Sequence, residues 1–171
     1  TEAERRQLLE EWNDTRTEYP RDTTLHALFE AEVARHPEAV AVEDARERLT
    51  YRQLDARANQ LAWYLRHKGV GPDVRVCLCV ERSPELIISL LGILKAGGAY
   101  VPLDPDYPLQ RLNYMLQDSE PVALLVHAAT RDLLGKPGVP LIDLDLGVWQ
   151  DQPHNNPQVP GLGATNLAYM I

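Results

Sequence analysis

Cysteine is almost absent from this chain, which has only Cys77 and Cys79 among its 171 residues. Both lie in an apolar segment expected to be a strand. Side chains two positions apart on a strand share a face, but their geometry is poor for a disulfide. No other Cys or His is close enough in sequence to complete a metal site. We therefore predict two buried, reduced thiols, which fit a reducing, cytoplasmic setting.

A concentrated basic region is also missing. The formal net charge is −8, and the 17 Lys and Arg residues are scattered along the chain. Binding to nucleic acid needs clustered positive charge, so we predict no nucleic-acid partner. The longest strongly apolar helical run, Leu86 to Leu94, is too short to cross a bilayer. The charged first residues do not resemble a signal peptide, so we predict a soluble protein with no membrane partner.

Residue patterns that carry catalysis are missing too. There is no G-x-G-x-x-G and no P-loop. The stretch from Lys95 to Gly98 follows a helix, and the C-terminal end of a helix repels phosphate. Ser83 has no nearby base and suits a helix cap, while Asp143 and Asp145 suit a solvated strand end. The residues themselves therefore predict no catalytic, cofactor-binding or metal-ligating side chain.

Local signals divide the first third of the chain into short elements. Thr1 and Glu4 form a capping box for a short charged helix, and a polar connector follows it. We expect residues 1–22 to be a linker into a domain at 23–171. A second helix is expected from Thr24 to His36, because apolar residues recur there at helical spacing. That apolar stripe comprises Leu25, Leu28, Phe29 and Val33.

The rest of the chain alternates between strand and helix patterns. Thr50 and Gln53 suit the capping box of a helix that Gly69 ends, and Ser83-Pro84 suits the start of another. In that second helix, small Ser89 and Gly92 would let a neighbouring backbone approach closely. Strand–helix–strand order predicts an α/β fold of parallel strands with crossover helices. The elements expected are a hairpin at 39–42 and 48–51, helices at 51–68, 84–96, from 108 and at 130–134, and strands at 74–80, 99–103, 122–126 and 141–144.

The last residues suggest an interrupted element. A polar loop rich in proline and glycine, 151–163, precedes the apolar stretch NLAYMI at 166–171, which has the pattern of a strand. A natural chain rarely stops inside an apolar strand, because the unfinished strand leaves an adhesive edge. We therefore expect the chain to be truncated.

Three segments resemble, in order and spacing, the core motifs of nonribosomal peptide synthetase adenylation domains. They are LTYRQL at 49–54, LKAGGAYVPLD at 94–104 and LAYMI at 167–171. The first 15 residues resemble the linker from an upstream condensation domain, and 22–42 resembles the entry into the adenylation domain. The motif positions carried over, all as scaffold residues, are Leu49, Thr50, Tyr51, Leu54, Leu94, Lys95, Ala96, Gly97, Tyr100, Pro102 and Asp104.

The resemblance implies the N-terminal part of the large subdomain of an adenylate-forming enzyme. Such an enzyme uses ATP and Mg²⁺ to convert a carboxylate, most often of an amino acid, into an acyl-adenylate. The acyl group then passes to the phosphopantetheine thiol of a downstream carrier protein. The implied partners are the remainder of the adenylation domain, the condensation and carrier domains, and a small activator protein. The family's reactive groups would follow Ile171, so we expect this piece alone to be inactive and to bind neither ATP nor Mg²⁺.

Two alternatives remain open at this point. A ligase for fatty or aryl acids shares the same fold, and an acidic pocket residue that pairs with an α-amino group would distinguish the two classes. That residue would lie beyond this chain. The other alternative is a non-catalytic α/β interaction module that ends at Ile171, which would account for the missing active-site pattern.

Overall fold

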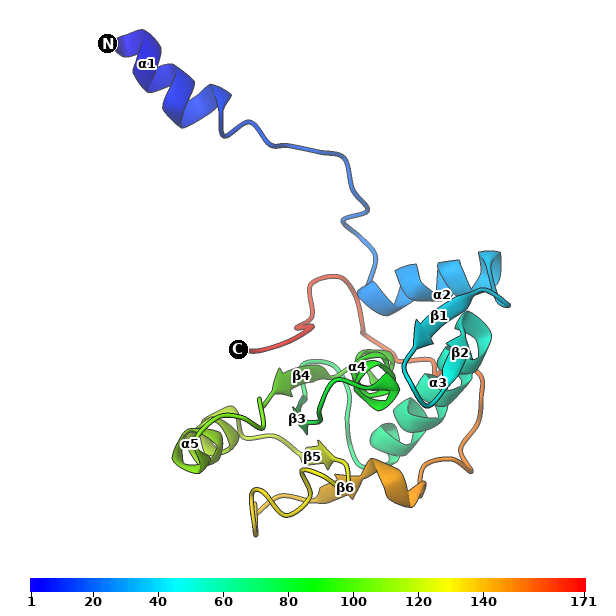
Figure 1. Ribbon diagram of the computed structural model, residues 1–171. Coiled ribbons are helices and arrows are strands. Elements are labelled where there is room, and N and C mark those ends of the chain that lie inside the picture. Colours follow the sequence, from blue (N-terminus) through cyan, green and yellow to red (C-terminus); the bar gives the residue numbers. More distant parts are fainter.

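A four-stranded parallel sheet lies at the centre of the structure, a computed structural model that describes residues 1–171. The strand order is β4-β3-β5-β6, and every neighbouring pair is parallel. Helix α4 connects β3 to β4, and α5 connects β4 to β5 (Figure 1). The α/β fold with crossover helices is therefore confirmed. The bounds are β3 Arg75–Cys79, α4 Pro84–Ala96, β4 Ala99–Pro102, α5 Leu109–Ser119, β5 Ala123–Val126 and β6 Leu141–Asp143.

Alternation of side chains along the strands produces two cores, one on each face of the sheet. Val76 and Leu78 of β3 join the core that contains residues of α3 (Tyr51–His67) and α4. Cys77 and Cys79 of the same strand join the other core, with Leu112 and Leu116 of α5. Both faces of β3 and β5 are covered, which is why these strands are apolar on both sides.

Helices α3 and α4 have capped N-terminal ends and pack closely against each other at Gly92. Thr50 and Gln53 form the predicted capping box of α3, and Ser83 Oγ accepts from the backbone N–H of Leu86 to cap α4. A Cβ added at Gly92 of α4 would lie 2.9 Å from Cδ2 of Leu61. A neighbouring helix thus approaches Gly92 closely, but the contact is with the Leu61 side chain and not with the backbone.

The N-terminal elements differ from this packed region. A helical stretch formed by α1 (Glu2–Arg6) and the π-helical η1 (Gln7–Glu11) has no buried residue and stands away from the sheet (Figure 1). Helix α2 (Leu25–Arg35) lies against α3 and α4, with Phe29 packed on the core. Leu25 and Leu28 of its apolar stripe are 56% and 44% exposed, so the stripe faces the core only in part.

The hairpin prediction is confirmed, whereas one predicted helix is wrong. Strands β1 (Val40–Glu43) and β2 (Arg48–Thr50) pair antiparallel in a separate two-stranded sheet. Residues 130–134 form turns. The reason is that the Thr130 hydroxyl donates to the carbonyl of Cys79, 2.5 Å away, which fixes this segment to the end of β3.

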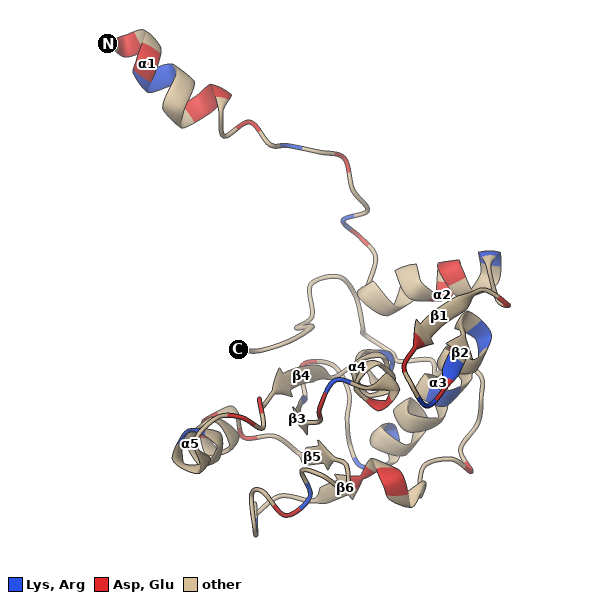
Figure 2. Cartoon of the chain, viewed as in Figure 1, with Lys and Arg blue, Asp and Glu red and all other residues tan.

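Asp143 is also placed differently from the prediction of a solvated strand end. Its side chain is buried and forms an ion pair with Arg131. It also caps the 3-10 helix η2 (Leu144–Leu146) by accepting from the backbone N–H of Asp145. A buried carboxylate persists only when it is paired in this way. Elsewhere Lys and Arg are spread over several elements (Figure 2). None of the helices combines the length and apolar character needed to cross a membrane.

Both thiols are expected to react slowly with a chromogenic disulfide reagent at pH 8. Cys77 and Cys79 are free and buried, and burial raises the pKa of each to about 11. The unfolded chain loses these protons nearer the ordinary pKa of 9.0. The thiols therefore favour the folded state fully below pH 9.0, and this contribution is lost as the pH rises towards 11. Release of two thiols only after unfolding in guanidinium would agree, whereas immediate labelling of the folded protein would contradict the expectation.

Candidate functional site

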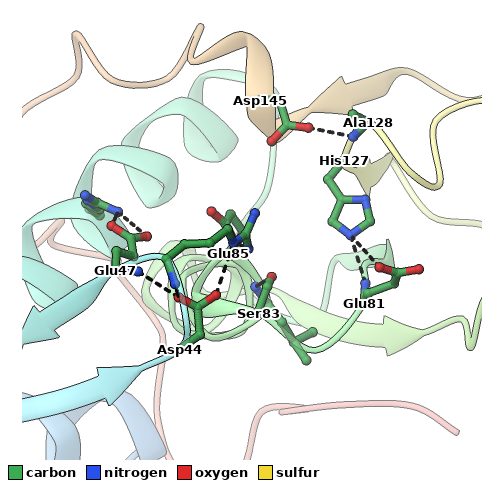
Figure 3. Close-up of polar contacts among 11 residues, drawn as sticks. Asp44, Glu47, Glu81, Ser83, Glu85, His127, Ala128 and Asp145 are labelled. Atoms are coloured by element: carbon green, nitrogen blue, oxygen red, sulfur yellow. Dashed lines mark hydrogen bonds and ion pairs between the residues drawn. The ribbon is translucent and has the colours of Figure 1, made fainter.

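Polar side chains gather beyond the carboxyl ends of β3, β5 and β6 (Figure 3). In open α/β sheets, ligands bind in the crevice outside this edge. The group lines a shallow hollow between the β1–β2 turn, the start of α4 and the loops after β5 and β6. We call it the edge cluster. Its members are Arg46, Glu81, Ser83, Glu85, His127 and Asp145.

Most of the polar groups in the edge cluster hold backbone in place. Nε2 of His127 accepts from the backbone N–H of Glu81 at 3.2 Å, and Asp145 accepts from that of Ala128 at 2.6 Å. Ser83 is occupied as the cap of α4, and Arg46 lies 3.5 Å from the Glu85 carboxylate. A nucleophilic serine needs a base within hydrogen-bond reach, and the hydroxyl of Ser83 is instead directed at a helix terminus. The cluster therefore secures the ends of strands and the start of α4, and the absence of a catalytic residue stays a prediction.

A larger groove of about 950 Å³ lies beside the edge cluster, between the carboxyl end of β4 and helices α4 and α5. Its walls are mostly apolar, and the guanidinium of Arg111 stacks 3.9 Å from the ring centre of Tyr107. Asp104 lies at its rim, where one carboxylate oxygen accepts from the N–H of Asp106. Ile171 also lines the groove, so the last residues of the chain reach the carboxyl edge of the sheet.

The first motif secures the hairpin to α3. Leu49 and Leu54 are buried in the core shared with α4, and Thr50 caps α3. The ring of Tyr51 stacks on Phe29 of α2 with centroids 5.8 Å apart. These residues pack, cap and stack within the N-terminal part of the fold, and none of them lines the edge cluster or the groove. Their role as scaffold residues stays a prediction.

Lys95 of the second motif has the most unusual environment in the chain. Its side chain has no exposed surface, and its Nζ lies 2.5 Å from Glu30 Oε1 and 2.9 Å from Asp55 Oδ1. Nζ also donates to Asn156 Oδ1 at 3.1 Å. The ammonium group therefore joins α2, α3, α4 and the loop that follows η2. Nearby, burial chiefly lowers the pKa of His26; Glu30 opposes this shift, and Lys95 adds to it.

Sequence reasoning missed this network. It interpreted Lys95 only as part of a helix end, although a single lysine inside the apolar helix PELIISLLGILKA was a usable signal. A buried charge requires partners, so the pattern could have predicted carboxylates from other elements. It could not have identified Glu30 and Asp55, which lie 65 and 40 positions earlier.

The remainder of the second motif carries the chain out of α4 and into β4. Leu94 and Ala96 lie in the last turn of α4, and Gly97 ends the helix at φ 93°, a left-handed conformation that suits glycine. Tyr100 lies within β4, and Pro102 is its last residue. Asp104 begins the turn towards α5.

The structure brings the second motif and the C-terminal segment 166–171 together. The Tyr100 N–H donates to the Ala168 carbonyl, and the Met170 N–H donates to the Tyr100 carbonyl. The rings of Tyr100 and Tyr169 stack 5.7 Å apart. The predicted strand at 166–171 is reduced to one isolated parallel bridge. Pro102, which has no N–H to offer, stands where the next ladder bond from β4 would begin.

One family profile, described as AMP-binding enzyme, matches residues 29–171. Among curated proteins, a linear gramicidin synthase of Brevibacillus parabrevis is 49% identical over 100% of this chain. Bacitracin synthase 3 of Bacillus licheniformis is 47% identical, also over 100% of the chain. In both cases the chain spans only 3% of the relative's length.

Solved structures give the same comparison in three dimensions. The nonribosomal peptide synthetase FmoA3 in its α-methyl-L-serine-AMP bound form superposes with a TM-score of 0.87 and 32% identity. The match covers 97% of this chain and 19% of that chain. An AMPPNP-bound form of the same synthetase superposes with a TM-score of 0.83.

Proposed function

Because this chain belongs to the AMP-binding enzyme family, we propose that it is the N-terminal part of an amino-acid-activating adenylation domain in a nonribosomal peptide synthetase. The observation that carries the proposal is the likeness to peptide synthetases along the whole chain, at 49% and 47% identity. The structure adds that the second motif and the C-terminal segment pair at Tyr100 of β4, and that Ile171 lines the groove at the carboxyl edge, where α/β folds bind ligands.

The proposed reaction has two steps. The carboxylate of an amino acid attacks the α-phosphorus of ATP, pyrophosphate leaves, and an aminoacyl-adenylate forms. The thiol of a carrier-protein phosphopantetheine then attacks the acyl carbon, and AMP leaves. Mg²⁺ would neutralise charge on the phosphates. Solved structures of FmoA3 in an α-methyl-L-serine-AMP bound form and in an AMPPNP-bound form support ATP as the substrate.

The residues of this chain do not fit a triphosphate. The Lys95 ammonium is buried and already paired with two carboxylates, and Gly97-Gly98 lies at the C-terminal end of α4, where the helix dipole opposes anions. We therefore assign no chemical step to these residues. In our proposal they supply the scaffold for a reacting centre built by the remainder of the domain, and the 171 residues alone are inactive.

The proposed partners follow from the modular nature of these synthetases. Residues 1–22 would be the linker from a condensation domain, which is supported by the exposed N-terminal helix that stands apart from the sheet (Figure 1). The remainder of the adenylation domain, a downstream carrier protein and a small activator protein complete the proposed set. The two free, buried thiols support a cytoplasmic setting.

The full-length protein that carries this chain is expected to catalyse ATP–pyrophosphate exchange that depends on an amino acid. Labelled pyrophosphate incorporated into ATP would be measured with each of the common amino acids, and with fatty and aryl acids as matched alternatives. Stimulation by one or a few amino acids is the expected result. Stimulation by fatty or aryl acids alone would overturn the substrate class, and a folded protein with no exchange would contradict the proposed activity.

A further inference from the structure

Asp73 anchors the C-terminal segment from a position far away in the sequence. Its Oδ1 accepts from the backbone N–H of Leu167 at 2.7 Å, and its Oδ2 accepts from the side-chain amide of Asn166 at 2.9 Å. These two donors lie 94 and 93 positions after Asp73. Hydrogen bonds to an ionised carboxylate are shorter and stronger than neutral ones. Both oxygens of this side chain are thus committed to one short stretch of the chain.

The backbone of Asp73 is held in a costly conformation. Its φ is 63°, and Glu120 is the only other non-glycine residue with a positive φ. Aspartate tolerates this left-handed region better than most residues, yet it still adopts it at some cost. The residue occupies the turn between Gly71-Pro72 and β3, where glycine would fit without strain. An aspartate in this place is explained by what its carboxylate binds.

Asp73 holds the part of the C-terminal segment that lies before its bridge to β4, residues 164–167. Downstream, the segment is tied to β4 through the bridge between Tyr100 and Tyr169. Upstream, Asn156 binds the buried Lys95 ammonium and the Val159 side chain packs beside Gly97. Residues 164–167 lie between these attachments, and the Asp73 carboxylate holds them there.

We propose that Asp73 is a positioning residue that fixes the path of residues 166–171 along β4 and so sets how the chain enters the carboxyl edge of the sheet. Ile171 lines the groove at that edge, where α/β folds bind their ligands. This inference rests on the proposed function, under which the ligand is ATP. Asp73 touches no substrate and acts through the segment that it holds.

The test uses the full-length protein with two glycine variants. Asp73→Gly removes the carboxylate and relieves the positive φ, so the anchor is lost without added backbone strain. Glu120→Gly is the matched control, because it relieves the same kind of strain and removes only an exposed pairing with Arg75. Hydrogen–deuterium exchange of residues 164–171 and the KM and kcat for ATP and for the amino acid would be measured for both.

In Asp73→Gly we expect exchange at residues 166–170 to accelerate about tenfold, because a charge-assisted hydrogen bond is lost. Under the proposed function the KM for ATP should rise about tenfold, because the loosened segment leads the chain into the edge of the sheet where α/β folds bind their ligands. A merely structural defect would lower kcat and leave both KM values unchanged. Glu120→Gly should behave like the wild type in every measurement.

Two results would overturn the proposal. One is wild-type exchange protection in Asp73→Gly, which would show that the carboxylate is not the anchor. The other is faster exchange with an unchanged KM for ATP, which would show that the segment's path does not affect the nucleotide. If the wild-type protein has no activity with any acid, the proposed function fails, while the exchange measurement still decides the anchor.

Discussion

Replacing Lys95 with methionine is expected to lower the free energy of unfolding by about 3 kcal/mol. The variant removes a fully buried ammonium and leaves the carboxylates of Glu30 and Asp55 facing each other without a cation. Removing one partner of a buried ion pair costs far more than the pair itself contributes, because the remaining charge keeps its desolvation penalty. Chemical denaturation followed by circular dichroism would measure the change.

The control for this prediction is an exposed lysine. Lys136→Met removes the same charge from the surface, where substitutions change stability by less than about 0.5 kcal/mol. A Lys95→Met protein as stable as the wild type would contradict the network. The same variant should also free Asn156, so we expect the loop at 151–163 to exchange its amide protons faster.

Leu61→Ala is expected to lower the free energy of unfolding by about 3 kcal/mol, because the side chain is fully buried between α3 and α4. The loss combines the transfer free energy of the removed methyl groups with that of the cavity left behind. Leu9→Ala is the matched control, since Leu9 is 61% exposed on the N-terminal helix and its removal should change stability little. Thermal and denaturant unfolding would both report the difference.

Gly92→Ala tests the same contact from the other helix. In the otherwise wild-type protein, the methyl group added at residue 92 would lie 2.9 to 3.1 Å from Leu61 atoms. We therefore expect the free energy of unfolding to fall by about 1 kcal/mol, despite the better helix propensity of alanine. In the Leu61→Ala background only the Cβ of residue 61 remains of this contact, at 3.1 Å, so the same change should lower the free energy of unfolding clearly less than it does in the wild-type background. Additive effects in this double-mutant cycle would contradict the close packing of α3 on α4.

The prediction of helix ends succeeded because each end depends on residues close together in the chain. Thr50 bonds to the residue three positions later, and Ser83 does the same at the start of α4. Gly97 ends its helix through its own backbone freedom. The strands were equally visible, because continuous apolar runs indicate strands covered on both faces. Their connection by helices then predicted parallel pairing.

The prediction failed where a local preference competed with a distant contact. Residues 130–134 have a helical pattern, but the bond from Thr130 to the end of β3 holds them in turns. The apolar stretch at 166–171 has the pattern of a strand, yet only one bridge forms on the outer edge of β4. In each case a neighbour from another part of the fold decided the outcome.

The sequence alone thus determined the elements, their order, the parallel sheet and the membership of a family, because apolar periodicity and helix caps are properties of neighbouring residues. Only the tertiary structure decided the roles of the charged side chains. Lys95 and Asp143 are buried and paired, and the exposed Asp73 holds the C-terminal segment, each through partners from 12 to 94 positions away. A charge is stable away from water only where the fold brings an opposite charge or a donor to it, and that meeting depends on how the whole chain packs.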